Sequence, residues 1–510
     1  MKSYVFIPIT VIVILIAMSC ASVPLIIPGA DAAFDDPPAP RQTAVCVHDP
    51  SVFYAGNNEF YVIGSHIATA KTSDFITWQQ VTLDWNSRRN NFMPTDNPNP
   101  AIQTMAQQTA DVLRGKEHDI GYYAADIHMM PNGKYYQYYC LTSSWKCSAI
   151  GLAIADKVEG PYITQGLIVR SDAAANNSMS PNGARQWSVP RHPNCIDPAA
   201  YWDKNKEKFY MTYGSWSGGI FLYEMDPVTG MKKAGSAINE ENDGYGRKLI
   251  RNNHVSIEAP YIFYSPETDY YYLTVSYGGL AASGGYQQRV FRSRSPVGPF
   301  SDAKHPGIDM SSTEFMYSQH SEYGIKIMGP YQFKSLSGEP MGSTGYLSPG
   351  HNSVSYNADT GRYYLVYHTR FTGRGEMHEV RAAEMFMNED GWPMAAPFRF
   401  DGGAIRTFTK DMLHGTWKLI NHQRDINTEP HMSVPYIFLE DGNITDAKGG
   451  VAGSWALGED GKTAHITVAD VLYKGVFIRI YDDDKRKWVQ AFTALSEDGI
   501  ALWGAGAAGK

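Results

Sequence analysis

Five stretches of the chain share one pattern, in which a polar residue opens an apolar run, and a turn and an aromatic-rich run follow. The stretches are DPSVFYAGNNEFYVIG from Asp49, DIHMMPNGKYYQYYCL from Asp126, DPAAYWDKNKEKFYMTYG from Asp197, EAPYIFYSPETDYYYLTVSYG from Glu258 and HNSVSYNADTGRYYLVYH from His351. Two apolar runs separated by Gly, Asn or Asp are typical of a β-hairpin. Each stretch therefore predicts two antiparallel strands.

Further strand candidates follow the hairpins, such as SAIGLAIAD at 148–156, GGIFLYEMD at 218–226 and QRVFRSRS at 288–295. Units of roughly 60–90 residues with three or four strands are typical of propeller blades that carry loops. We therefore predict an all-β protein with a five-bladed β-propeller over residues 42–410. A β-sandwich is the alternative, but it does not explain why the same position of each unit holds an ionisable residue.

From about Leu413 the pattern changes to short alternating strands with tight Gly and Asp turns, as in HGTWKLINHQ and YKGVFIRIYDDD. This alternation predicts a small antiparallel β-barrel over residues 413–510. The segment has no leading acid and no evident catalytic cluster. We expect it to support the propeller, and an accessory contact with substrate is the second possibility.

The charge balance limits the partners. The chain has 44 Lys and Arg against 52 Asp and Glu, a net charge of −8, and no basic tract. Such a chain is a poor binder of nucleic acid or anionic membrane surfaces. We expect a neutral ligand, no protein partner and a monomer.

The N-terminus predicts export. Residues 4–18, YVFIPITVIVILIAM, form an apolar run that is typical of a secretory signal peptide. Small residues at 30–32 suit ordinary cleavage, which would remove residues 1–32, whereas AMSC at 17–20 is an imperfect lipoprotein-type site with a lipid anchor at Cys20. Both routes export the protein, which would be secreted, periplasmic or a cell-surface lipoprotein.

The remaining cysteines do not predict a metal site. Cys46, Cys140, Cys147 and Cys195 have neither CxxC nor Cys/His spacing, so we do not expect zinc. Cys140 and Cys147 either form a disulfide or stay as free buried thiols, and the sequence favours neither.

Asp49 and Glu258 are the best pair for acid–base chemistry. Hydrolysis of a glycosidic bond needs one carboxyl group that protonates the leaving oxygen and another that activates water or attacks. The longer Glu258 lies between the apolar Ile257 and Ala259, where desolvation favours its protonated form. The shorter Asp49 suits a base that holds water, and Asp197 would raise the pKa of the acid through like-charge coupling.

A single Asp-Pro dipeptide is usually a turn opener. Here two Asp-Pro dipeptides and one Glu-Ala-Pro occur at the same position of a repeat. The inner strands of a propeller begin around one mouth of its axial channel, so these acids would lie together, which favours catalysis. Asp126 has the same phase, and we expect it to be structural or to position substrate. His351 in SPGHNSVSY lies among these acids, so it is expected to support a metal or the catalytic network. A hard cation prefers oxygen ligands, and several waters would complete its shell.

Aromatic side chains can stack on the apolar faces of sugar rings. Four aromatic residues in Gly/Ser-rich segments are candidates for such contacts, with packing as the alternative: Trp145, Trp216, Tyr277 and Tyr286. The segments 214–219 and 278–285 are rich in glycine, which allows the backbone to approach a ligand. They lack the P-loop lysine and a dinucleotide fingerprint, so we do not expect nucleotide binding.

The motifs VHDPSV, IDPAAYWD, IEAPYIFYS and SPGHNSV together resemble glycoside hydrolase family 43, most of all its endo-acting arabinanases. SAIGLAIAD, YGSWSGGIF, VSYGGLAASGGY, YHTRF and MFMNEDGWPM extend the resemblance over nearly the whole chain after the export segment. The resemblance implies a catalytic propeller with a C-terminal barrel. It also implies inverting hydrolysis of α-1,5-linked L-arabinofuranosyl chains, the arabinan of pectin side chains.

By this resemblance Asp49 is the general base, Glu258 is the general acid and Asp197 tunes the pKa of the acid. The resemblance also implies a calcium ion near the centre, with His351 as a ligand. The chain departs from the family at YAAD, residues 123–126, where relatives often have Trp-Ala-Pro-Asp. The missing Trp leaves the substrate subsite at this point open.

Two alternative functions stay open. The same scaffold serves exo-acting arabinofuranosidases or β-xylosidases, and a surface glycan-binding propeller would lack catalysis. The intact Asp49, Asp197 and Glu258 argue against the second alternative. A retaining fructan-processing enzyme and a WD-repeat scaffold are disfavoured, because neither a WMNDPNG-like opening nor a recurring GH…WD signature is present.

Overall fold

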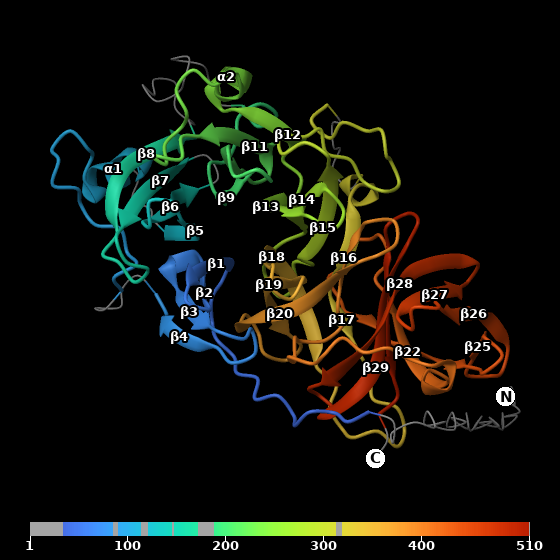
Figure 1. Ribbon diagram of the computed structural model, residues 1–510. Helices are drawn as coiled ribbons and strands as arrows, with labels where there is room; N and C mark the ends of the chain where they lie inside the picture. The colour runs from blue at the N-terminus through green and yellow to red at the C-terminus, as the bar shows by residue number, and fades with distance from the viewer. Residues whose placement is uncertain are drawn as a thin grey trace, which may run out of the picture.

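The computed structural model describes residues 34–84, 90–113, 121–144, 147–171, 188–312 and 319–508. These residues form antiparallel β-sheets arranged in a ring, with a barrel beside it (Figure 1), which confirms the predicted all-β fold. The predicted signal peptide with Cys20 lies outside the described residues. No helix in the described part of the chain has the length and apolar character needed to cross a membrane.

Four sheets of four strands and one sheet of six strands form the five predicted blades. Blade 1 contains β1 (Ser51–Gly56), β2 (Glu59–Ile63), β3 (Thr69–Thr72) and β4 (Gln79–Thr82). Blade 2 contains β5 (Gly121–Met129), β6 (Tyr135–Ser144), β7 (Cys147–Ala155) and β8 (Ile163–Arg170). Blade 3 contains β9 (Ala199–Trp202), β10 (Phe209–Tyr213), β11 (Ser217–Met225) and β12 (Arg247–Asn253).

Blade 4 contains β13 (Ile257–Ser265), β14 (Tyr270–Tyr277), β15 (Gln287–Ser293) and β16 (Ile325–Met328). Blade 5 contains β17 (Tyr331–Gln332), β18 (Gly345–Asn357), β19 (Arg362–Phe371), β20 (His378–Met387) and β21 (Pro393–Ala395). The described helices are short: α1 (Met105–Leu113), α2 (Ala237–Gly244) and the 3₁₀ helices η1 (Ser65–Ile67), η2 (His320–Glu322) and η3 (Lys410–Met412).

The first strand of each repeat is the inner strand of its blade. β1, β5, β9, β13 and β18 lie at the centre of the ring (Figure 1), and each contacts the inner strands of its two neighbours, so that β18 meets β1 and closes the ring. This arrangement brings the beginnings of five strands that are far apart in the sequence to the propeller axis.

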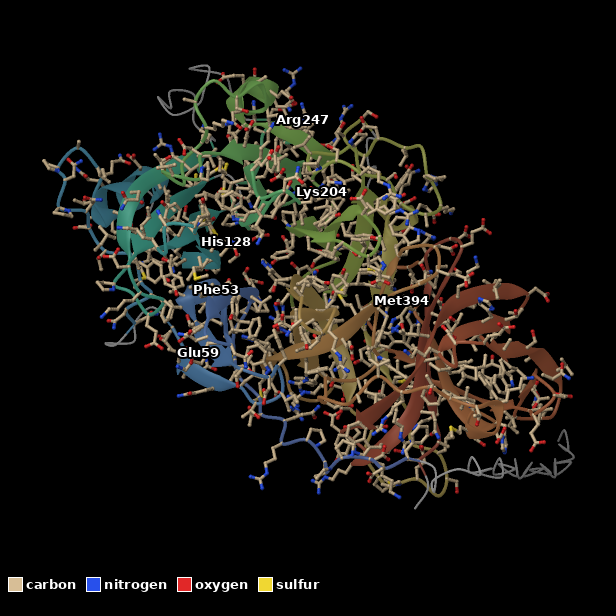
Figure 2. The ribbon with its side chains drawn as sticks, in the orientation of Figure 1. Phe53, Glu59, His128, Lys204, Arg247 and Met394 are labelled. Atoms are coloured by element: carbon tan, nitrogen blue, oxygen red, sulfur yellow. The ribbon has the colours of Figure 1, made fainter. Side chains whose placement is uncertain are left out.

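Alternation along the middle strands explains why the repeats are dense in Tyr and Phe. On β2, Phe60 packs between blades 1 and 5, whereas Tyr61 packs between blades 1 and 2. On β6, Tyr138 packs against blade 3 and Tyr139 packs against blade 1. Successive side chains of a strand point to opposite faces, so each blade contributes to two of five apolar clusters that fill the spaces between blades (Figure 2).

The C-terminal segment forms a closed barrel of eight strands. The strands are β22 (Gly415–Asn421), β24 (Val434–Phe438), β25 (Asn443–Asp446), β26 (Val451–Leu457), β27 (Thr463–Val468), β28 (Val471–Asp482), β29 (Lys487–Ser496) and β30 (Ala501–Gly506). Its interior is a packed aromatic and aliphatic core around Trp417, Phe438, Phe477 and Phe492.

The barrel is joined to the propeller more closely than the sequence pattern predicts. The short strand β23 (His431–Met432) comes from the barrel segment, yet it pairs in parallel with β17 of blade 5. Lys418 Nζ on β22 lies 2.8 Å from Glu339 Oε1 of the propeller, and both side chains are fully buried. The alternation that predicts a separate barrel cannot show such pairing, because a two-residue strand has no period of its own.

Candidate active site

One unusual backbone conformation occurs in every blade, on the inner strand or two residues before it. The φ angle is 56° at Asp49, 41° at Ala124, 57° at Asp197, 54° at Ala259 and 47° at His351. A non-glycine residue with positive φ is uncommon, and such strain persists where the surrounding structure enforces it, often at a functional site. The five blades therefore share one left-handed residue near the axis.

The position of this residue corrects the predicted phase of two acids. Glu258 precedes the left-handed residue of blade 4, and Asp126 follows that of blade 2 by two positions. Two residues along a strand span roughly 7 Å. Asp49, Asp197 and His351 are therefore equivalent, whereas Glu258 and Asp126 are displaced in opposite directions along their strands.

Asp126 lies inside the propeller and joins neighbouring blades. Its side chain is almost fully buried and accepts hydrogen bonds from Ser51 Oγ (2.6 Å) in blade 1, Ala200 N (2.7 Å) in blade 3 and His128 Nε2 (2.9 Å) in its own blade. Burial alone would raise its pKa, but His128 and these hydrogen bonds lower it. Asp126 is therefore structural, which corrects the prediction of a substrate contact.

A cavity of about 310 Å³ brings the other predicted residues together. Asp49, Asp197, Glu258 and His351 all line it, from four different blades. The remaining lining residues are Tyr123, Thr142, Ser143, Asn194, Ile196 and Leu280. This is the shared pocket that acid–base catalysis requires of residues that are far apart in the sequence.

Asp49 is held as a charged carboxylate. Its Oδ2 accepts hydrogen bonds from His48 Nδ1 (2.8 Å) and from Ser65 Oγ, and its Oδ1 lies 3.0 Å from His351 Nδ1. Burial would raise the pKa of Asp49, but the electrostatic interactions and hydrogen bonds with His48 and His351 outweigh burial and hold it well below its usual value. A group that stays deprotonated in this way suits a general base.

A chain of side chains holds His48 in turn. Arg370 Nη2 donates to His48 Nε2 (3.2 Å), so the Nδ1 of His48 carries the proton that it donates to Asp49. Arg370 Nε also pairs with Glu376 Oε2 (2.7 Å), and the Glu376 carboxylate accepts the N–H of Ala282 at 3.1 and 3.2 Å. The base is thereby connected to the glycine-rich segment 278–285, which contributes Leu280 to the cavity.

Glu258 has the opposite electrostatic character. Ser215 Oγ donates to its Oε2 (2.8 Å) and Tyr286 Oη donates to its Oε1 (2.9 Å). Burial raises the pKa of Glu258, the two hydroxyl donors lower it, and the nearby charge of Asp49 raises it again, with a net upward shift. A carboxyl group whose protonated form is favoured suits a general acid.

Asp197 is fixed directly beside the acid. Its Oδ2 accepts the N–H of Ala259 (3.0 Å), the residue that follows Glu258. Burial, together with the charges of Glu258 and Asp49, raises the pKa of Asp197 to about 7 against the opposing effect of His351. Because repulsion between two carboxylates is mutual, Asp197 and Glu258 titrate as a pair.

His351 is the cationic member of the cavity. Burial lowers its pKa, but the charge and hydrogen bond of Asp49 and the two other carboxylates outweigh burial and raise it to about 9. Since Asp49 occupies Nδ1, a metal would have to bind Nε2 in competition with a proton. A calcium ion at His351 would need Nε2 without its proton, and water would supply most of the other ligands.

His48, Asp49 and His368 also place potential metal ligands within 4.8 Å of one another. The ligand atoms already have partners, because His48 contacts Asp49 and Arg370, and His368 Nδ1 accepts the N–H of Asp49 (3.1 Å). Burial, followed by the electrostatic effects of the neighbouring His48 and Arg370, holds the pKa of His368 well below its usual value, so this ring is neutral. The group therefore supports the backbone and carboxylate of Asp49.

The predicted substrate contacts have varied outcomes. Tyr277 is fully buried against Arg289 and His320, which corrects that prediction. Tyr286 is also buried and contacts Glu258, so it acts on the acid. Trp216 is partly exposed beside His254 and stays a prediction, and Trp145 lies outside the described residues.

The thiols of Cys46, Cys140, Cys147 and Cys195 are free.

Sequence reasoning missed several residues that support the acids. His48 directly precedes Asp49 and His368 lies in the motif YHTRF, so both were within reach of a motif-based search. Ser215 lies in the motif YGSWSGGIF and was equally within reach, whereas Ser65 had no signal, because only the folded chain places its hydroxyl beside a carboxylate.

A five-bladed propeller that holds one carboxylate charged and favours the protonated form of another in the same cavity has the machinery of a glycoside hydrolase. Residues 43–324 match Glycosyl hydrolases family 43, and residues 397–504 match a C-terminal lipocalin-like domain. The chain belongs to glycosyl hydrolase family 43.

Individual relatives are similar over both parts of the chain. The extracellular endo-alpha-(1->5)-L-arabinanase 2 of Bacillus subtilis is 41% identical over 90% of this chain and 92% of its own length. The family 43 YxiA protein of Bacillus licheniformis is 38% identical, with a TM-score of 0.79 over 91% of this chain and 99% of that one. The endo-1,5-alpha-L-arabinanase of Thermotoga petrophila is 35% identical, with a TM-score of 0.80 over 91% of this chain and 99% of that one.

Proposed function

We propose that the protein is an inverting endo-hydrolase that cuts α-1,5-linked L-arabinofuranosyl chains, with arabinan as its substrate. The names of the similar proteins from Bacillus subtilis and Thermotoga petrophila support this substrate. In this proposal Asp49 is the general base, Glu258 is the general acid and Asp197 tunes the pKa of the acid.

One observation carries the proposal: Asp49 and Glu258 line the same cavity in opposite electrostatic surroundings. Environments that push the pKa values of two carboxyl groups apart assign the roles of base and acid. In an inverting hydrolase the base activates a water on one side of the sugar, and the acid protonates the leaving oxygen. Asp49 would accept the proton of that water, and Glu258 would give its proton to the leaving group.

We include a hydrated calcium ion at His351 in the proposal. The ion would add positive charge beside the carboxylates, and its oxygen ligands would be mainly waters. The test is removal of divalent cations with a chelator, followed by activity and thermal melting with and without added calcium. Restoration of either property by calcium supports the ion, and indifference of both contradicts it.

Export is supported by the word extracellular in the name of the similar Bacillus subtilis protein. The proposed routes remain cleavage after residue 32 or lipidation of Cys20. Mass spectrometry of the mature N-terminus separates them, because a lipid adds mass to a chain that begins at Cys20. Light scattering tests the expected monomer.

The products from linear arabinan test the proposed reaction. Endo-attack releases a mixture of oligosaccharides early in the reaction, whereas arabinose as the sole early product would favour the exo-acting alternative. Proton NMR of the first products should show β-configured reducing ends, since inversion converts an α linkage into a β product. Early α anomers would contradict the inverting mechanism.

The alternative of a non-catalytic glycan-binding propeller is tested with Glu258→Ala. An enzyme should keep its affinity for arabino-oligosaccharides in this variant and lose turnover. Parent protein that binds the oligosaccharides without cleaving them would favour the binding role.

A further inference from the structure

A loop of blade 4 contributes an apolar side chain to the wall of the catalytic cavity. The loop joins β14 to β15 over residues 278–286, and its Leu280 lines the cavity with 45% of the residue exposed. A single exposed leucine is ordinary at a protein surface. This one lies in the same cavity as three carboxyl groups, and ligand sites combine apolar walls with a few polar groups. Leu280 can therefore contact the apolar face of a sugar ring.

The residues that follow Leu280 are held by blade 5. Ser348 Oγ, on β18, donates a hydrogen bond to the carbonyl oxygen of Ala281 (2.6 Å). The carboxylate of Glu376, in the segment between β19 and β20, accepts the N–H of Ala282 at 3.1 and 3.2 Å. The place of Leu280 in the cavity wall therefore depends on two side chains of the neighbouring blade.

The same Glu376 carboxylate also holds Arg370. Arg370 Nε donates to Glu376 Oε2 (2.7 Å), and Arg370 Nη2 donates to His48, the partner of Asp49. Arg370 is 4% exposed, and its Nη1 has no hydrogen-bond partner among the described residues. The guanidinium group is thus oriented by two partners, and Glu376 is one of them.

These contacts contribute little to stability. The side chain of Glu376 is 63% exposed. Solvent screens an exposed ion pair, and holding two long side chains in one geometry costs entropy, so such pairs stabilise a protein only slightly. The consequence of the Glu376 contacts therefore lies in the positions that they fix, the apolar wall on one side and the partner of the base on the other.

We propose that Glu376 is a positioning residue for both sides of the catalytic cavity. Through the backbone of the loop it holds Leu280 against the sugar, and through Arg370 and His48 it orients the base Asp49. The inference rests on the proposed hydrolysis, and it adds Leu280 as a substrate contact. Loss of Glu376 should change substrate binding and turnover together, whereas loss of the Leu280 side chain should change binding alone.

The test is the measurement of kcat and KM on linear arabinan for a set of variants. Leu280→Ala should raise KM about three- to tenfold at parental kcat, since it removes part of an apolar contact and leaves the base in place. Glu376→Ala should raise KM by a similar factor and also lower kcat about tenfold, because a small displacement of a catalytic group slows the reaction. The double variant should show no further rise in KM, because Glu376 cannot position a side chain that is absent.

Glu376→Gln is the conservative variant. It keeps the length of the side chain and one acceptor oxygen, so it can accept a hydrogen bond from Arg370 or from Ala282 but not from both. Its kcat and KM should therefore lie between those of the parent and those of Glu376→Ala.

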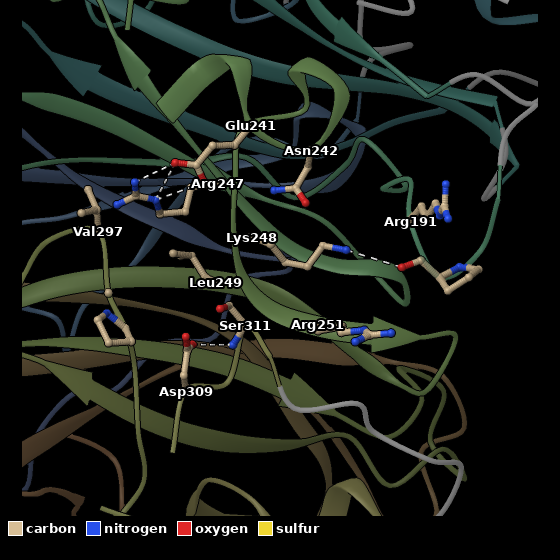
Figure 3. A pocket seen from close by; sticks show the side chains of 13 residues that line it. Arg191, Glu241, Asn242, Arg247, Lys248, Leu249, Arg251, Val297, Asp309 and Ser311 are labelled. Carbon is tan, nitrogen blue, oxygen red and sulfur yellow. Dashed lines mark hydrogen bonds and ion pairs between the residues drawn. The ribbon is translucent and has the colours of Figure 1, made fainter. Parts of the chain in front are cut away.

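Glu241→Ala is the matched control. Glu241 pairs with an arginine that is also six residues away in the sequence, and Arg247 Nη2 lies 2.7 Å from its Oε1 (Figure 3). This pair lines another cavity, of about 540 Å³, which shares no lining residue with the catalytic cavity. Loss of the Glu241 carboxylate should leave both kcat and KM unchanged.

A melting curve of each variant checks folding, and Glu376→Ala should melt close to the parent because the ion pair is exposed. The proposal is overturned if Glu376→Ala keeps either kcat or KM at the parental value, or if the effects of Glu376→Ala and Leu280→Ala on KM multiply in the double variant. Parent protein that does not cut linear arabinan contradicts the proposed hydrolysis itself. An active parent with unchanged Glu376 variants contradicts the positioning role alone.

Discussion

The propeller axis and the barrel interior are both lined by inward-facing side chains of antiparallel strands, yet they have opposite chemistry. The barrel encloses a packed apolar core in which the rings of Trp417, Phe438 and Phe492 contact one another in stacked or tilted arrangements. The axis encloses the carboxylates of Asp49 and Asp197, each only 7% exposed, on residues with a left-handed backbone.

The difference indicates that the axis carries the chemistry, whereas the barrel core contributes to stability. Burial without partners is unfavourable for charge, and the axis offsets that cost with neighbouring histidines, hydroxyl donors and backbone N–H groups. The barrel needs no such partners, because dispersion and the hydrophobic effect stabilise it directly. Substitutions at the axis should therefore change chemistry first, and substitutions in the barrel should change the free energy of unfolding first.

The largest expected effect is that of Glu258→Ala on turnover. Loss of a general acid should lower kcat by about 10²- to 10⁴-fold. The measurement is release of reducing ends from linear arabinan, and Glu459→Gln, an exposed carboxylate of the barrel, is the control that should behave like the parent. Undiminished activity in Glu258→Ala would remove this residue from the mechanism.

In the barrel, Trp417→Ala should lower the free energy of unfolding by about 3–5 kcal/mol. The indole is fully buried among Phe438, Phe477 and Phe492, and its removal leaves a cavity. Urea unfolding measures the effect, and Val451→Ala at a 74% exposed position is the control. A loss as small as that of the control would show that the barrel core collapses around the missing ring.

A smaller loss of stability is expected at the centre of the propeller, for Asp126→Asn. An amide group in place of the carboxylate cannot accept all the hydrogen bonds of Ser51, Ala200 and His128, which should cost about 1–3 kcal/mol. Asp156→Asn, at an 82% exposed carboxylate, is the control. If Asp126 bound substrate instead, the variant would raise KM at parental stability.

The smallest expected effect is on the pH profile of Ser215→Ala. The hydroxyl of Ser215 stabilises the charged form of Glu258, so its removal raises the pKa of the acid. A general acid works in its protonated form, and activity falls as pH rises through its pKa. The alkaline limb of kcat/KM should therefore move to higher pH by about one unit.

Tyr286→Phe should move the alkaline limb in the same direction, since Tyr286 donates to the other oxygen of Glu258. Ser454→Ala, at an exposed position of the barrel, should leave the profile in place. If the alkaline limb of kcat/KM is unchanged or moves to lower pH in both Ser215→Ala and Tyr286→Phe, a group other than Glu258 controls it.

Much of the fold could be predicted from local patterns. Turn residues between apolar runs predict the hairpins, and their repetition predicts five blades, because these signals depend on residues that are neighbours in the sequence. The phase of the leading residues was only partly predictable. Asp49 and Asp197 are equivalent, but the left-handed residue of blade 4 is Ala259 and not Glu258.

The amino-acid sequence alone determined the repeat, the number of blades, the change to a barrel near residue 413 and the acids that face the axis. Tertiary structure alone decided that Asp126 joins blades, that Tyr277 is buried, and that His48 and His351 keep Asp49 charged. The physical reason is that alternation selects the face of a strand, whereas burial and hydrogen-bond partners come from segments up to hundreds of residues away. The pKa values of the acid and the base depend on those partners.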